Sequence, residues 1–478
     1  MCGIVVLHGS NAMLRLPSCL GRLRHRGPDD QYIWSQDQIA LGFTRLAING
    51  VGIEGRQPLQ LGNYIGAFNG EIYNYQELIH EHGLSLNSCD THVILPIFEK
   101  FGLRTLDLLD GFYSGVIHQL GSSEVYCLRD HMGKKPLFVG RSGSETFITS
   151  ELKSINNIDW FESLPLGVSQ VDLHTGRVTA IFGHSKYQTQ RKLLELFNLA
   201  VAKRMPPKDQ PVGIFLSGGL DSSLIASAVS RLRDDVTYFT LGNDEGPDRK
   251  SVELLVSALG LQDVRFLPLP EFDRIPDLIK SVVYSTESYN PSIVSNGIAT
   301  YLLAQAAHDA GIKVVLTGEG ADELFGGYHL FKENDPWRET RAQLISDMQF
   351  TELRRLDLSC MAHSVEPRCP FLDRHIHAFS DQLSFNDLYS DGENKVMLRH
   401  CLSSLLPSEI LHRKKMSFDV GSGIRGQVVR YLRQNGRSER EELRIIWNQH
   451  FDHQESNSYF HSYPTFDALI DRRGESHR

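Results

Sequence analysis

Two short apolar runs that each end in a glycine-rich turn constrain the fold of this chain more than any other feature. They are PVGIFLSGG at 211–219 and IKVVLTGEG at 312–320, and each predicts a buried strand that leads into a tight turn. Helical and strand-like patterns alternate around them, with helices at 221–232 and 297–311 and a strand at 236–242. Such alternation predicts a parallel sheet covered on both faces, with strands that open at their carboxyl ends onto one crevice.

The part of the chain before this region has a different pattern. Short β-rich runs broken by Gly, Asn and Asp dominate it, with one helical pattern at 90–102. A polar segment at 182–190 is typical of a linker, and beyond about residue 330 the pattern is mostly helical. We therefore expect two domains, an α+β domain over 2–185 and an α/β domain over 190–478 with a helical C-terminal part.

The composition excludes several classes of protein. The formal net charge is −9, so no overall basic field would attract nucleic acid. The seven cysteines are scattered and form no CxxC pair, which argues against a disulfide framework or a zinc site and for a reducing compartment. The start of the chain lacks the basic segment of a signal peptide, and no run approaches the roughly 18 apolar residues of a membrane span. We expect a cytoplasmic protein without a membrane span or a nucleic-acid-binding surface.

The turn FLSGGLDSS at 215–223 predicts a site for phosphate. Gly218 and Gly219 let backbone N–H groups approach an anion, and the following helix directs its N-terminus at the same place. The turn lacks the Gly-Lys-Ser/Thr ending of a Walker A loop. Asp221 would repel phosphate unless a cation lies between them, and Mg²⁺ is the simplest such cation. The alternative is a plain glycine turn in which Asp221 and Ser222 cap the helix.

The second turn, VVLTGEGADELFGGY at 314–328, carries three acidic residues. They are Glu319, Asp322 and Glu323. Because both turns follow strands of one predicted parallel sheet, they should open onto the same crevice. We therefore expect Asp322 to lie opposite Asp221 as a second Mg²⁺ ligand.

Cys2 directly precedes the first apolar run, Ile4–Leu7. If Met1 is removed, Cys2 becomes the N-terminal residue and carries both a thiol nucleophile and an α-amine that can act as its base. The alternative is that Cys2 is only a small residue at the start of a strand.

The two glycine-rich turns together resemble the ATP-pyrophosphatase domain of the asparagine synthetase family, whose N-terminal half is a glutaminase that begins with Cys after removal of Met. Further motifs of the family follow in order: RHRGPDD at 24–30, TRLAI at 44–48, FNGEIYN at 68–74, CDTHVIL at 89–95, RDHMGKKPL at 129–137, SELKS at 150–154 and EPRCPFLD at 366–373. The resemblance runs from residue 2 to about residue 425. It implies an N-terminal αββα sandwich of the Ntn (N-terminal nucleophile) type and a C-terminal PP-loop domain of the adenine-nucleotide α-hydrolase-like fold.

The resemblance implies a glutamine site around Cys2 as the catalytic nucleophile. A guanidinium suits a carboxylate bidentately, so Arg45 would hold the α-carboxylate of glutamine. Asn69 and Gly70 would form the oxyanion hole, and Glu71 and Asp90 would fix the amino group. The full set of implied glutamine-binding residues is Arg45, Leu46, Ala47, Ile48, Asn69, Gly70, Glu71 and Asp90. For Arg45 and Asp90 the alternative is a surface ion pair.

The resemblance also implies sites for ATP and Mg²⁺. The implied ATP-binding residues are Leu216, Ser217, Gly218, Gly219, Asp221, Ser222, Leu241, Thr317 and Gly318, and Asp221 and Asp322 are the implied metal ligands. Glu319 matches a catalytic position tied to formation of an acyl-adenylate. Lys415 in HRKKMSF resembles a catalytic lysine that meets the charge on the adenylate and pyrophosphate; the alternative is a solvated lysine in a basic cluster.

The implied activity is that of a glutamine-dependent, AMP-forming amidotransferase, a carbon–nitrogen ligase. Its partners would be glutamine, ATP and a carboxylate acceptor, and its oligomeric state, including a homodimer, stays open. The segment TESYNPSIVSNG at 286–297 departs from the family near the acceptor. Asn290 replaces the usual acid and Ser295 the usual arginine, although Arg368 or Lys395 would be able to supply the missing charge.

The acceptor is therefore left open between aspartate and another carboxylate on a natural product, a sugar or a modified base. Two rival functions also remain. One is a ring-closing relative like the β-lactam synthetases or lasso-peptide cyclases, which generally lack a working Cys2 site. The other is a non-catalytic scaffold with relic sites, against which the complete pair of Asp221 and Asp322 counts.

Overall fold

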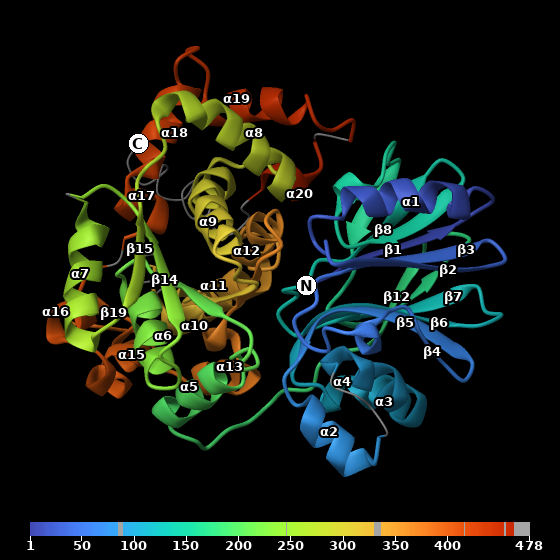
Figure 1. Ribbon diagram of the computed structural model, residues 1–478, viewed down its shortest axis with the longest axis horizontal. Helices are drawn as coiled ribbons and strands as arrows, with labels where there is room; N and C mark the ends of the chain where they lie inside the picture. Colours follow the sequence, from blue (N-terminus) through green and yellow to red (C-terminus); the bar gives the residue numbers. More distant parts are fainter. Residues whose placement is uncertain (85–88, 245, 329–335, 415, 454–455, 463–478) are drawn as a thin grey trace. The chain divides into compact units, whose positions relative to one another are not determined.

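The computed structural model describes residues 1–478 except 85–88, 245, 329–335, 415, 454–455 and 463–478 (Figure 1). The chain forms two compact units, of which the first comprises Met1–Ser185 with two short later segments and the second most of the remainder. No helix or strand is assigned between Phe182 and Leu193, in the region where the sequence predicts a linker. Of the helices described, none has the length and apolar character needed to cross a membrane.

The first unit contains two six-stranded antiparallel sheets. One has the strand order β10-β8-β9-β1-β3-β2 and the other the order β12-β11-β7-β6-β5-β4. The strands are β1 (Gly3–His8), β2 (Asp30–Gln36), β3 (Ile39–Arg45), β4 (Leu59–Leu61), β5 (Tyr64–Ile72), β6 (Gly111–Gln119), β7 (Glu124–Arg129), β8 (Phe138–Ser142), β9 (Glu145–Thr149), β10 (Trp160–Ser163), β11 (Gly167–Asp172) and β12 (Val178–Phe182).

The two sheets of this unit pack face to face and each is covered on its outer side by helices (Figure 1). Alternate residues of β1, Ile4 and Val6, enter the core between the sheets, where side chains of β5 meet them. Helix α1 (Ala12–Arg22) packs on β1 and β3, while α2 (Tyr75–His82), α3 (Ile94–Phe101) and α4 (Thr105–Leu108) lie on the side of the other sheet. The first unit is therefore an αββα sandwich, as the family resemblance implies.

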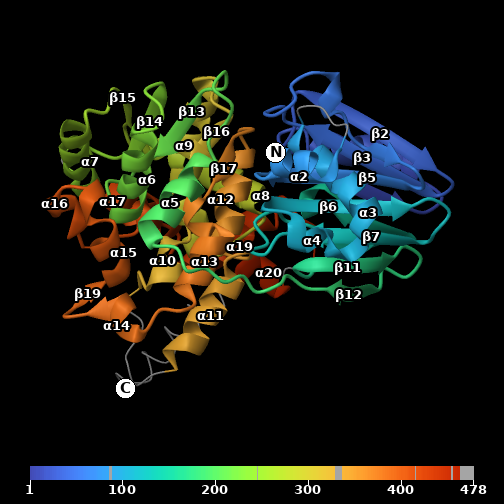
Figure 2. The ribbon, with the colours of Figure 1, turned by 90° about the horizontal axis from the view of Figure 1, so that it is seen from below.

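The second unit is built on a five-stranded parallel sheet with the order β15-β14-β13-β16-β17 (Figure 2). Its strands are β13 (Val212–Phe215), β14 (Val236–Leu241), β15 (Asp263–Leu267), β16 (Val314–Leu316) and β17 (Glu366–Arg368). The chain first winds from β13 outward to β15 and then returns to place β16 on the other side of β13. The strand order therefore reverses between β13 and β16, where open α/β sheets bind their ligands.

Helices fill the rest of the second unit. They are α5 (Leu193–Ala202), α6 (Leu220–Ser230), α7 (Pro247–Leu259), α8 (Ile275–Thr286), α9 (Pro291–Asp309), α10 (Ala321–Phe325), α11 (Trp337–Asp347), α12 (Glu352–Met361), α13 (Arg374–Ser380), α14 (Phe385–Leu388), α15 (Val396–Cys401), α16 (Ser408–Leu411), α17 (Phe418–Ser422), α18 (Ile424–Leu432), α19 (Glu439–Trp447) and α20 (Ser458–His461). A two-stranded hairpin of β18 (Tyr389–Ser390) and β19 (Glu393–Asn394) precedes α15. The parallel sheet and the helical C-terminal part agree with the predicted PP-loop fold.

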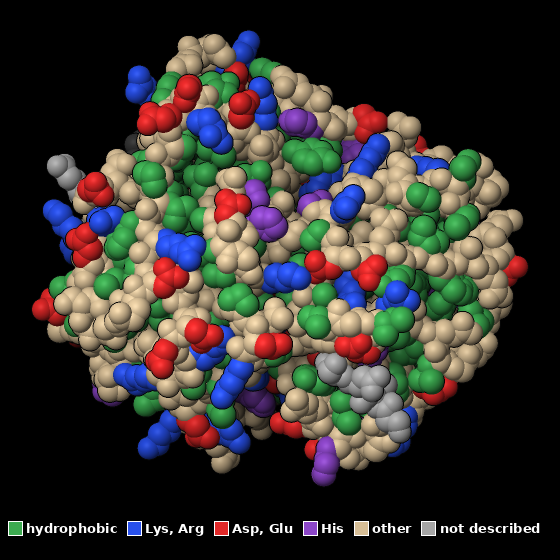
Figure 3. Space-filling model, viewed as in Figure 1, with side chains coloured by type: hydrophobic (Ala, Val, Ile, Leu, Met, Phe, Trp, Pro, Cys, Tyr) green, Lys and Arg blue, Asp and Glu red, His purple; other side chains and the backbone are tan. Residues whose placement is uncertain are grey.

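Charged side chains are mixed on the face of the molecule drawn in Figure 3. Lys and Arg are interspersed with Asp and Glu there, and no large area of one sign is visible.

Candidate active sites

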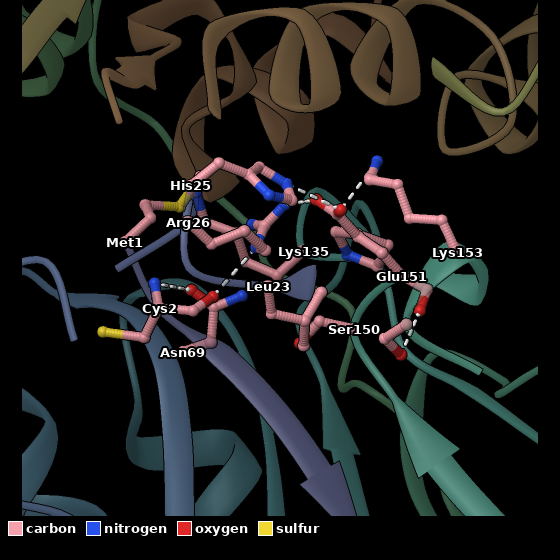
Figure 4. Close-up of polar contacts among 12 residues, drawn as sticks. Met1, Cys2, Leu23, His25, Arg26, Asn69, Lys135, Ser150, Glu151 and Lys153 are labelled. Carbon is pink, nitrogen blue, oxygen red and sulfur yellow. Dashed lines mark hydrogen bonds and ion pairs between the residues drawn. The ribbon is translucent and has the colours of Figure 1, made fainter. Parts of the chain in front are cut away.

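The first candidate site surrounds Cys2, which lies directly before β1. The backbone nitrogen of Cys2 donates a hydrogen bond to Oδ1 of Asn69 at 2.8 Å (Figure 4). Asn69 is fully buried in β5, and its Nδ2 has no hydrogen-bond partner among the described residues. Buried N–H donors are rarely left unpaired, so this one marks a position where a ligand oxygen would be stabilised.

Arg26 anchors Cys2 from the other side. Its Nε donates to the carbonyl oxygen of Cys2 at 2.9 Å, and its Nη1 pairs with Glu151 Oε1 at 2.5 Å (Figure 4). Both side chains of this pair are fully buried. The Cys2 sulfur points away from the cluster in Figure 4, so the arginine fixes the backbone of Cys2 and not its thiol.

Glu151 is the centre of this buried cluster. His25 Nε2 lies 2.9 Å and Lys153 Nζ 2.7 Å from its Oε2. Burial alone would raise the pKa of Glu151, but Lys153, His25 and Arg26 more than offset it and hold that pKa well below the usual range. Glu151 therefore stays ionised at neutral pH and keeps the Arg26 guanidinium in place. The sequence analysis assigns no role to Arg26 or Glu151, although Arg26 lies in the motif RHRGPDD and Glu151 in the motif SELKS.

Arg45 is positioned by the loop that follows β3. Its guanidinium is only slightly exposed, and Nη1 donates to the carbonyl of Gly52 at 2.7 Å while Nη2 donates to the carbonyl of Gly50. A Cβ atom at Gly55 would lie 1.8 Å from Nη2, so glycine is needed there to let the loop close around the arginine. Arg45 is thus held by carbonyl groups rather than in the surface ion pair considered as the alternative.

Gly70 and the two acidic residues complete this site. Gly70 has φ +150°, and a Cβ atom there would lie 2.1 Å from the carbonyl oxygen of Phe112 on β6, so no other residue fits. Glu71 Oε2 accepts from the side chain of Asn49 at 2.7 Å. Asp90 Oδ2 accepts from the backbone of Ile72 at 2.7 Å, and both carboxylates are buried.

Most of the predicted glutamine-binding residues line one small cavity of about 30 Å³. Those that line it are Arg45, Leu46, Ile48, Gly70, Glu71 and Asp90, together with Met1 and Cys2. Asn69 instead contacts the backbone of Cys2, whereas Ala47 does not line the cavity and donates its backbone N–H to Asp29 Oδ2 at 2.7 Å. The structure therefore brings together every predicted residue of this site except Ala47.

We expect mature active protein to lack Met1. Met1 is 2% exposed and lines the cavity beside Cys2, and its sulfur contacts Lys135 Nζ, so it fills space that a substrate needs. While Met1 is attached, Cys2 has no free α-amine and part of the cavity beside its thiol is filled. Intact-mass analysis should give a mass short of one methionine, and fully active protein that keeps Met1 would contradict this prediction.

The second candidate site lies between the carboxyl ends of β13 and β16. Gly218 has φ +65°, and Gly219 forms the N-cap of α6 without a side-chain cap. Ser217 and Ser222 brace the turn, since Ser222 Oγ accepts from the Ser217 backbone at 3.1 Å and lies 3.0 Å from Ser217 Oγ. The N-terminus of α6 is therefore left open toward a ligand, which fits a phosphate cradle better than a capped glycine turn.

Asp221 and Asp322 face each other across the side chain of Lys395. The Lys395 Nζ lies 2.6 Å from Asp221 Oδ2 and 2.6 Å from Asp322 Oδ1. Asp221 thus does not cap α6. Asp221 and Asp322 lie close together at the ends of the neighbouring strands β13 and β16, as the sequence predicts. The sequence does not predict the Lys395 ammonium between them.

These two carboxylates fit a Mg²⁺ ion in the chemistry of their donors. They are hard oxygen ligands, and they already hold one positive charge between them. Among the described residues no three His, Cys, Asp or Glu side chains gather into a metal site. Mg²⁺ usually takes only one or two protein carboxylates and completes its shell with water and substrate phosphates, so two are sufficient.

Two cavities adjoin Asp221. One, of about 40 Å³, is lined by Ser217, Gly219, Leu220, Asp221, Asp248, Asn394, Lys395, Arg399, Arg413, Lys414 and Met416. Four of these residues are basic and two are acidic, and Arg413 is oriented by Asp248 at 2.5 Å. The excess of positive charge beside the glycine turn suits phosphate groups.

The other cavity measures about 190 Å³ and contains Glu319. Arg355 donates to Glu319, to Glu352 Oε2 at 3.3 Å and to Thr300 Oγ1 at 2.7 Å. Asp221, Ser217, Ser222, Thr317, Gly318 and Asp322 also line this cavity. The two cavities share three lining residues, Ser217, Asp221 and Met416, and therefore adjoin each other.

The other predicted ATP-binding residues surround the same strands. Gly318 has no room for a side chain, since a Cβ atom would lie 2.7 Å from that of Asp221. Leu216 and Leu241 are buried at the ends of β13 and β14 and do not line the two cavities. Lys415, the predicted catalytic lysine, lies outside the described residues.

A buried acid beside this site gives a measurable dependence of stability on pH. Burial and the charges of Asp322 and Glu352 raise the pKa of Glu323 from 4.5 to about 8, although Tyr328 donates to it at 2.5 Å. An acid with a raised pKa binds its proton more tightly in the folded state, so it lowers stability as the pH rises from about 5 to about 8.

We therefore expect Glu323→Gln to become more stable relative to the unmodified protein as the pH rises over this range. Scanning calorimetry at several pH values measures the difference in Tm, and the exposed Glu339→Gln on α11 is the control. A Tm difference between Glu323→Gln and the unmodified protein that stays constant with pH would contradict the prediction.

Known proteins match both units of the chain. Residues 1–181 match the family described as glutamine amidotransferase domain, and residues 192–349 and 335–465 match the family described as asparagine synthase. Asparagine synthetase B [glutamine-hydrolyzing] of Escherichia coli K12 is 28% identical, over 84% of this chain and 78% of that protein. Asparagine synthetase [glutamine-hydrolyzing] 1 of Arabidopsis thaliana is 29% identical and the nodule asparagine synthetase [glutamine-hydrolyzing] of Pisum sativum is 30% identical, each over 88% of this chain and 78% of the relative. The asparagine synthase match spans more than half of the chain, and the chain therefore belongs to the asparagine synthase family, with a glutamine amidotransferase domain before its synthase domain.

Proposed function

We propose that this protein releases ammonia from glutamine at Cys2, activates a carboxylate with ATP as an acyl-adenylate, and joins the two into an amide. The observation that carries the first half is the Asn69 side chain. Its Oδ1 holds the nitrogen of Cys2, while its buried Nδ2 has no partner among the described residues. The first half-reaction is tested by measuring glutamate release from glutamine in the absence of any acceptor.

In the glutaminase step the Cys2 thiolate attacks the side-chain carbonyl carbon of glutamine. The developing oxyanion accepts hydrogen bonds from Asn69 Nδ2 and the backbone at Gly70, and these donors are already fixed by β5 and β6. Arg45 pairs with the substrate α-carboxylate, while Glu71 and Asp90 pair with its ammonium. Ammonia leaves with a proton from the Cys2 amine, and water then releases glutamate from the thioester.

In the synthetase step an oxygen of the acceptor carboxylate attacks the α-phosphorus of ATP and pyrophosphate leaves. The basic residues Lys395, Arg399 and Arg413 and the N-terminus of α6 receive the pyrophosphate. Glu319 and its partner Arg355 lie in the adjoining cavity, where the acyl carbon would be. Ammonia then attacks that carbon and AMP leaves. Mg²⁺, held by Asp221 and Asp322, would neutralise the charge that develops on the phosphates.

The geometry favours an acceptor other than aspartate. Asn290 caps α9, with its Oδ1 accepting from the backbone of Ser292 and its Nδ2 donating to the carbonyl of His461 at 2.9 Å. Ser295 donates to Asp419 Oδ2 at 2.7 Å. Both side chains at the positions where the family carries opposite charges are therefore engaged in holding the fold.

The alternative sources of positive charge are also engaged. Lys395 lies between two carboxylates, and Arg368 is buried and pairs with Glu366 at 2.7 Å. Among the described residues that line the larger cavity, Arg355 is the only cation, and it already contacts Glu319 and Glu352. These contacts support an acceptor whose recognition does not depend on a cationic partner for an α-carboxylate.

We expect a screen of carboxylic acids by ATP–pyrophosphate exchange to find an acid that is used at least about 10-fold better than aspartate in kcat/KM. The acids to compare are aspartate, glutamate, amino-sugar acids and carboxylated bases, with direct detection of the amide product. Exchange without added acid is the background control. Efficient formation of asparagine, with aspartate saturating at ordinary cellular concentrations, would instead assign plain asparagine synthesis.

The two rival functions have less support. A ring-closing synthetase needs no glutamine site, yet Cys2, Arg45, Asn69 and Asp90 form one compact constellation. A scaffold with relic sites has no need for an ion pair as close as that of Asp221 with Lys395. Release of glutamate from glutamine would exclude both rivals as the whole function.

A further inference from the structure

Lys395 occupies the place between two carboxylates where the proposed function puts a metal ion. Its ammonium contacts both oxygens of Asp221, at 2.7 and 2.6 Å, and Asp322 Oδ1 at 2.6 Å. The lysine side chain is 2% exposed, whereas those of the two aspartates are 15% and 16% exposed. An ammonium so placed balances charges that would otherwise repel each other at close range.

The surroundings of Lys395 are built to hold it there. Its backbone has φ +55°, a left-handed conformation that a non-glycine residue adopts only where its environment imposes it. Arg399 fixes the preceding residue, Asn394, with hydrogen bonds to its backbone carbonyl at 2.7 Å and its side-chain Oδ1 at 3.0 Å. Asn394 in turn donates to the carbonyl of Gly327 at 2.7 Å.

Gly327 lies directly against this ion pair and leaves room for it because it has no side chain. A Cβ atom at this position would lie 1.8 Å from Asp322 Oδ1 and 2.6 Å from Lys395 Cε. Any side chain here would therefore push the lysine and the carboxylate apart.

Lys395 also borders the cavity that suits phosphate. The same side chain lines the cavity with Gly219, Arg399 and Arg413, next to the N-terminus of α6. A phosphate group bound there would offer the ammonium new oxygen partners within a short movement of a flexible side chain. The carboxylates would then be free to bind a cation that arrives with the nucleotide.

We propose that Lys395 is an internal counter-ion that excludes divalent metal from Asp221 and Asp322 until nucleotide phosphates draw it away. This inference rests on the proposed function, in which these carboxylates bind the metal that accompanies ATP. It makes metal binding conditional on nucleotide, so the empty enzyme does not accumulate Mg²⁺ at its catalytic carboxylates. Lys395 is in this sense a positioning residue that sets the order in which the metal and the nucleotide bind.

The test measures metal binding without catalysis, using Mn²⁺ because it accepts the same oxygen ligands and is visible by electron paramagnetic resonance. The full chain is titrated with Mn²⁺ alone. We expect the unmodified protein to bind it weakly and Lys395→Met to bind it at least about 10-fold more tightly, since two facing carboxylates are then left without their cation. The control is Lys280→Met on α8, which lines neither cavity and should change Mn²⁺ affinity less than about 3-fold, because its side chain is 48% exposed and its charge is screened.

A second arm distinguishes failure of this inference from failure of the proposed function. Equilibrium dialysis with α,β-methylene-ATP measures the Mn²⁺ retained by the unmodified protein when a non-cleavable nucleotide is bound. If nucleotide promotes Mn²⁺ retention but Lys395→Met gains no affinity for Mn²⁺ alone, the metal site stands and the role of Lys395 is refuted. If nucleotide does not promote retention, the metal site of the proposed function fails and this inference fails with it.

The unmodified protein also tests the proposal without any variant. Micromolar binding of Mn²⁺ in the absence of nucleotide would overturn it, whether or not Lys395→Met folds. For the variant, a rise in Tm on adding Mn²⁺ alone gives a second readout, because a ligand that binds only the folded state raises its stability. No such rise is expected for the unmodified protein, and an equal rise in both proteins would also refute the role of Lys395.

Discussion

Cys2→Ala is expected to abolish glutamine hydrolysis, with a loss in kcat of at least about 1,000-fold, while synthesis with free ammonia continues. The substitution removes the sulfur that forms the thioester. Cys89 also lines the cavity, but burial raises the pKa of its thiol to about 12, so it is a poor replacement nucleophile. The contacts that hold the backbone of residue 2, from Asn69 and Arg26, do not involve the sulfur and should persist. Glutamate release and ammonia-dependent amide formation, measured on the same preparation, separate the two half-reactions.

The matched control for this experiment is Cys401→Ala. Cys401 is also a partly exposed free cysteine, but it lies in the second unit at the end of α15 and contacts only Met397 in the hydrogen bonds described. It should leave glutamine hydrolysis unchanged. If free ammonia fails to support synthesis by Cys2→Ala while that protein remains folded, either the division of labour between the two units or the assignment of Cys2 is wrong.

Local patterns in the sequence predicted the parallel sheet of the second unit and the convergence of Asp221 and Asp322, whereas the αββα sandwich and the PP-loop fold were implied by the family resemblance. Both glycine-rich turns follow strands of one parallel sheet, so they were expected to open onto the same crevice, and the structure places β13 and β16 next to each other in that sheet. Once they are adjacent, Asp221 and Asp322 must approach each other, because each follows its strand at a short fixed distance. The outcome is the pair of carboxylates that Lys395 bridges.

The residues that sequence reasoning missed act over long separations along the chain. Arg26 and Glu151 are 125 positions apart, and Lys395 is 174 positions from Asp221. No periodicity or spacing links such residues, because their proximity depends on how whole sheets and helices pack. A buried ion pair of this kind becomes visible only when the tertiary structure shows which charges share a space without water.

At Asn290 a local capping signal and a departure from the family fall on the same residue. The sequence Asn-Pro before a helical run is a strong N-cap signal, since Asn accepts from the first free N–H groups and Pro suits the first helical position. The same position is one where the family usually carries an acid. The cap and the hydrogen bond to the carbonyl of His461 show that Asn290 holds the start of α9, which the family resemblance alone does not predict.

Asp221→Asn and Asp322→Asn are each expected to lower ATP–pyrophosphate exchange by at least about 100-fold, because each removes one of two charged ligands proposed for Mg²⁺ at the triphosphate. The asparagine side chain keeps the size of the aspartate but cannot neutralise the metal. Each substitution also leaves the Lys395 ammonium with one carboxylate partner instead of two. Glutamine hydrolysis should persist in both variants, since Cys2 and its partners belong to the other unit.

The matched control is Asp244→Asn, in the loop that follows β14 at the same edge of the sheet. Its side chain is 93% exposed and pairs only loosely with Arg249, at 3.5 Å, so removing its charge tests whether any acid near this edge matters. Exchange in this variant should stay within about 2-fold of the unmodified protein, as expected for a screened surface charge. Near-normal pyrophosphate exchange in either Asp221→Asn or Asp322→Asn would refute their assignment as metal ligands. Equal losses in all three variants would instead point to the overall negative potential of this edge rather than to two specific ligands.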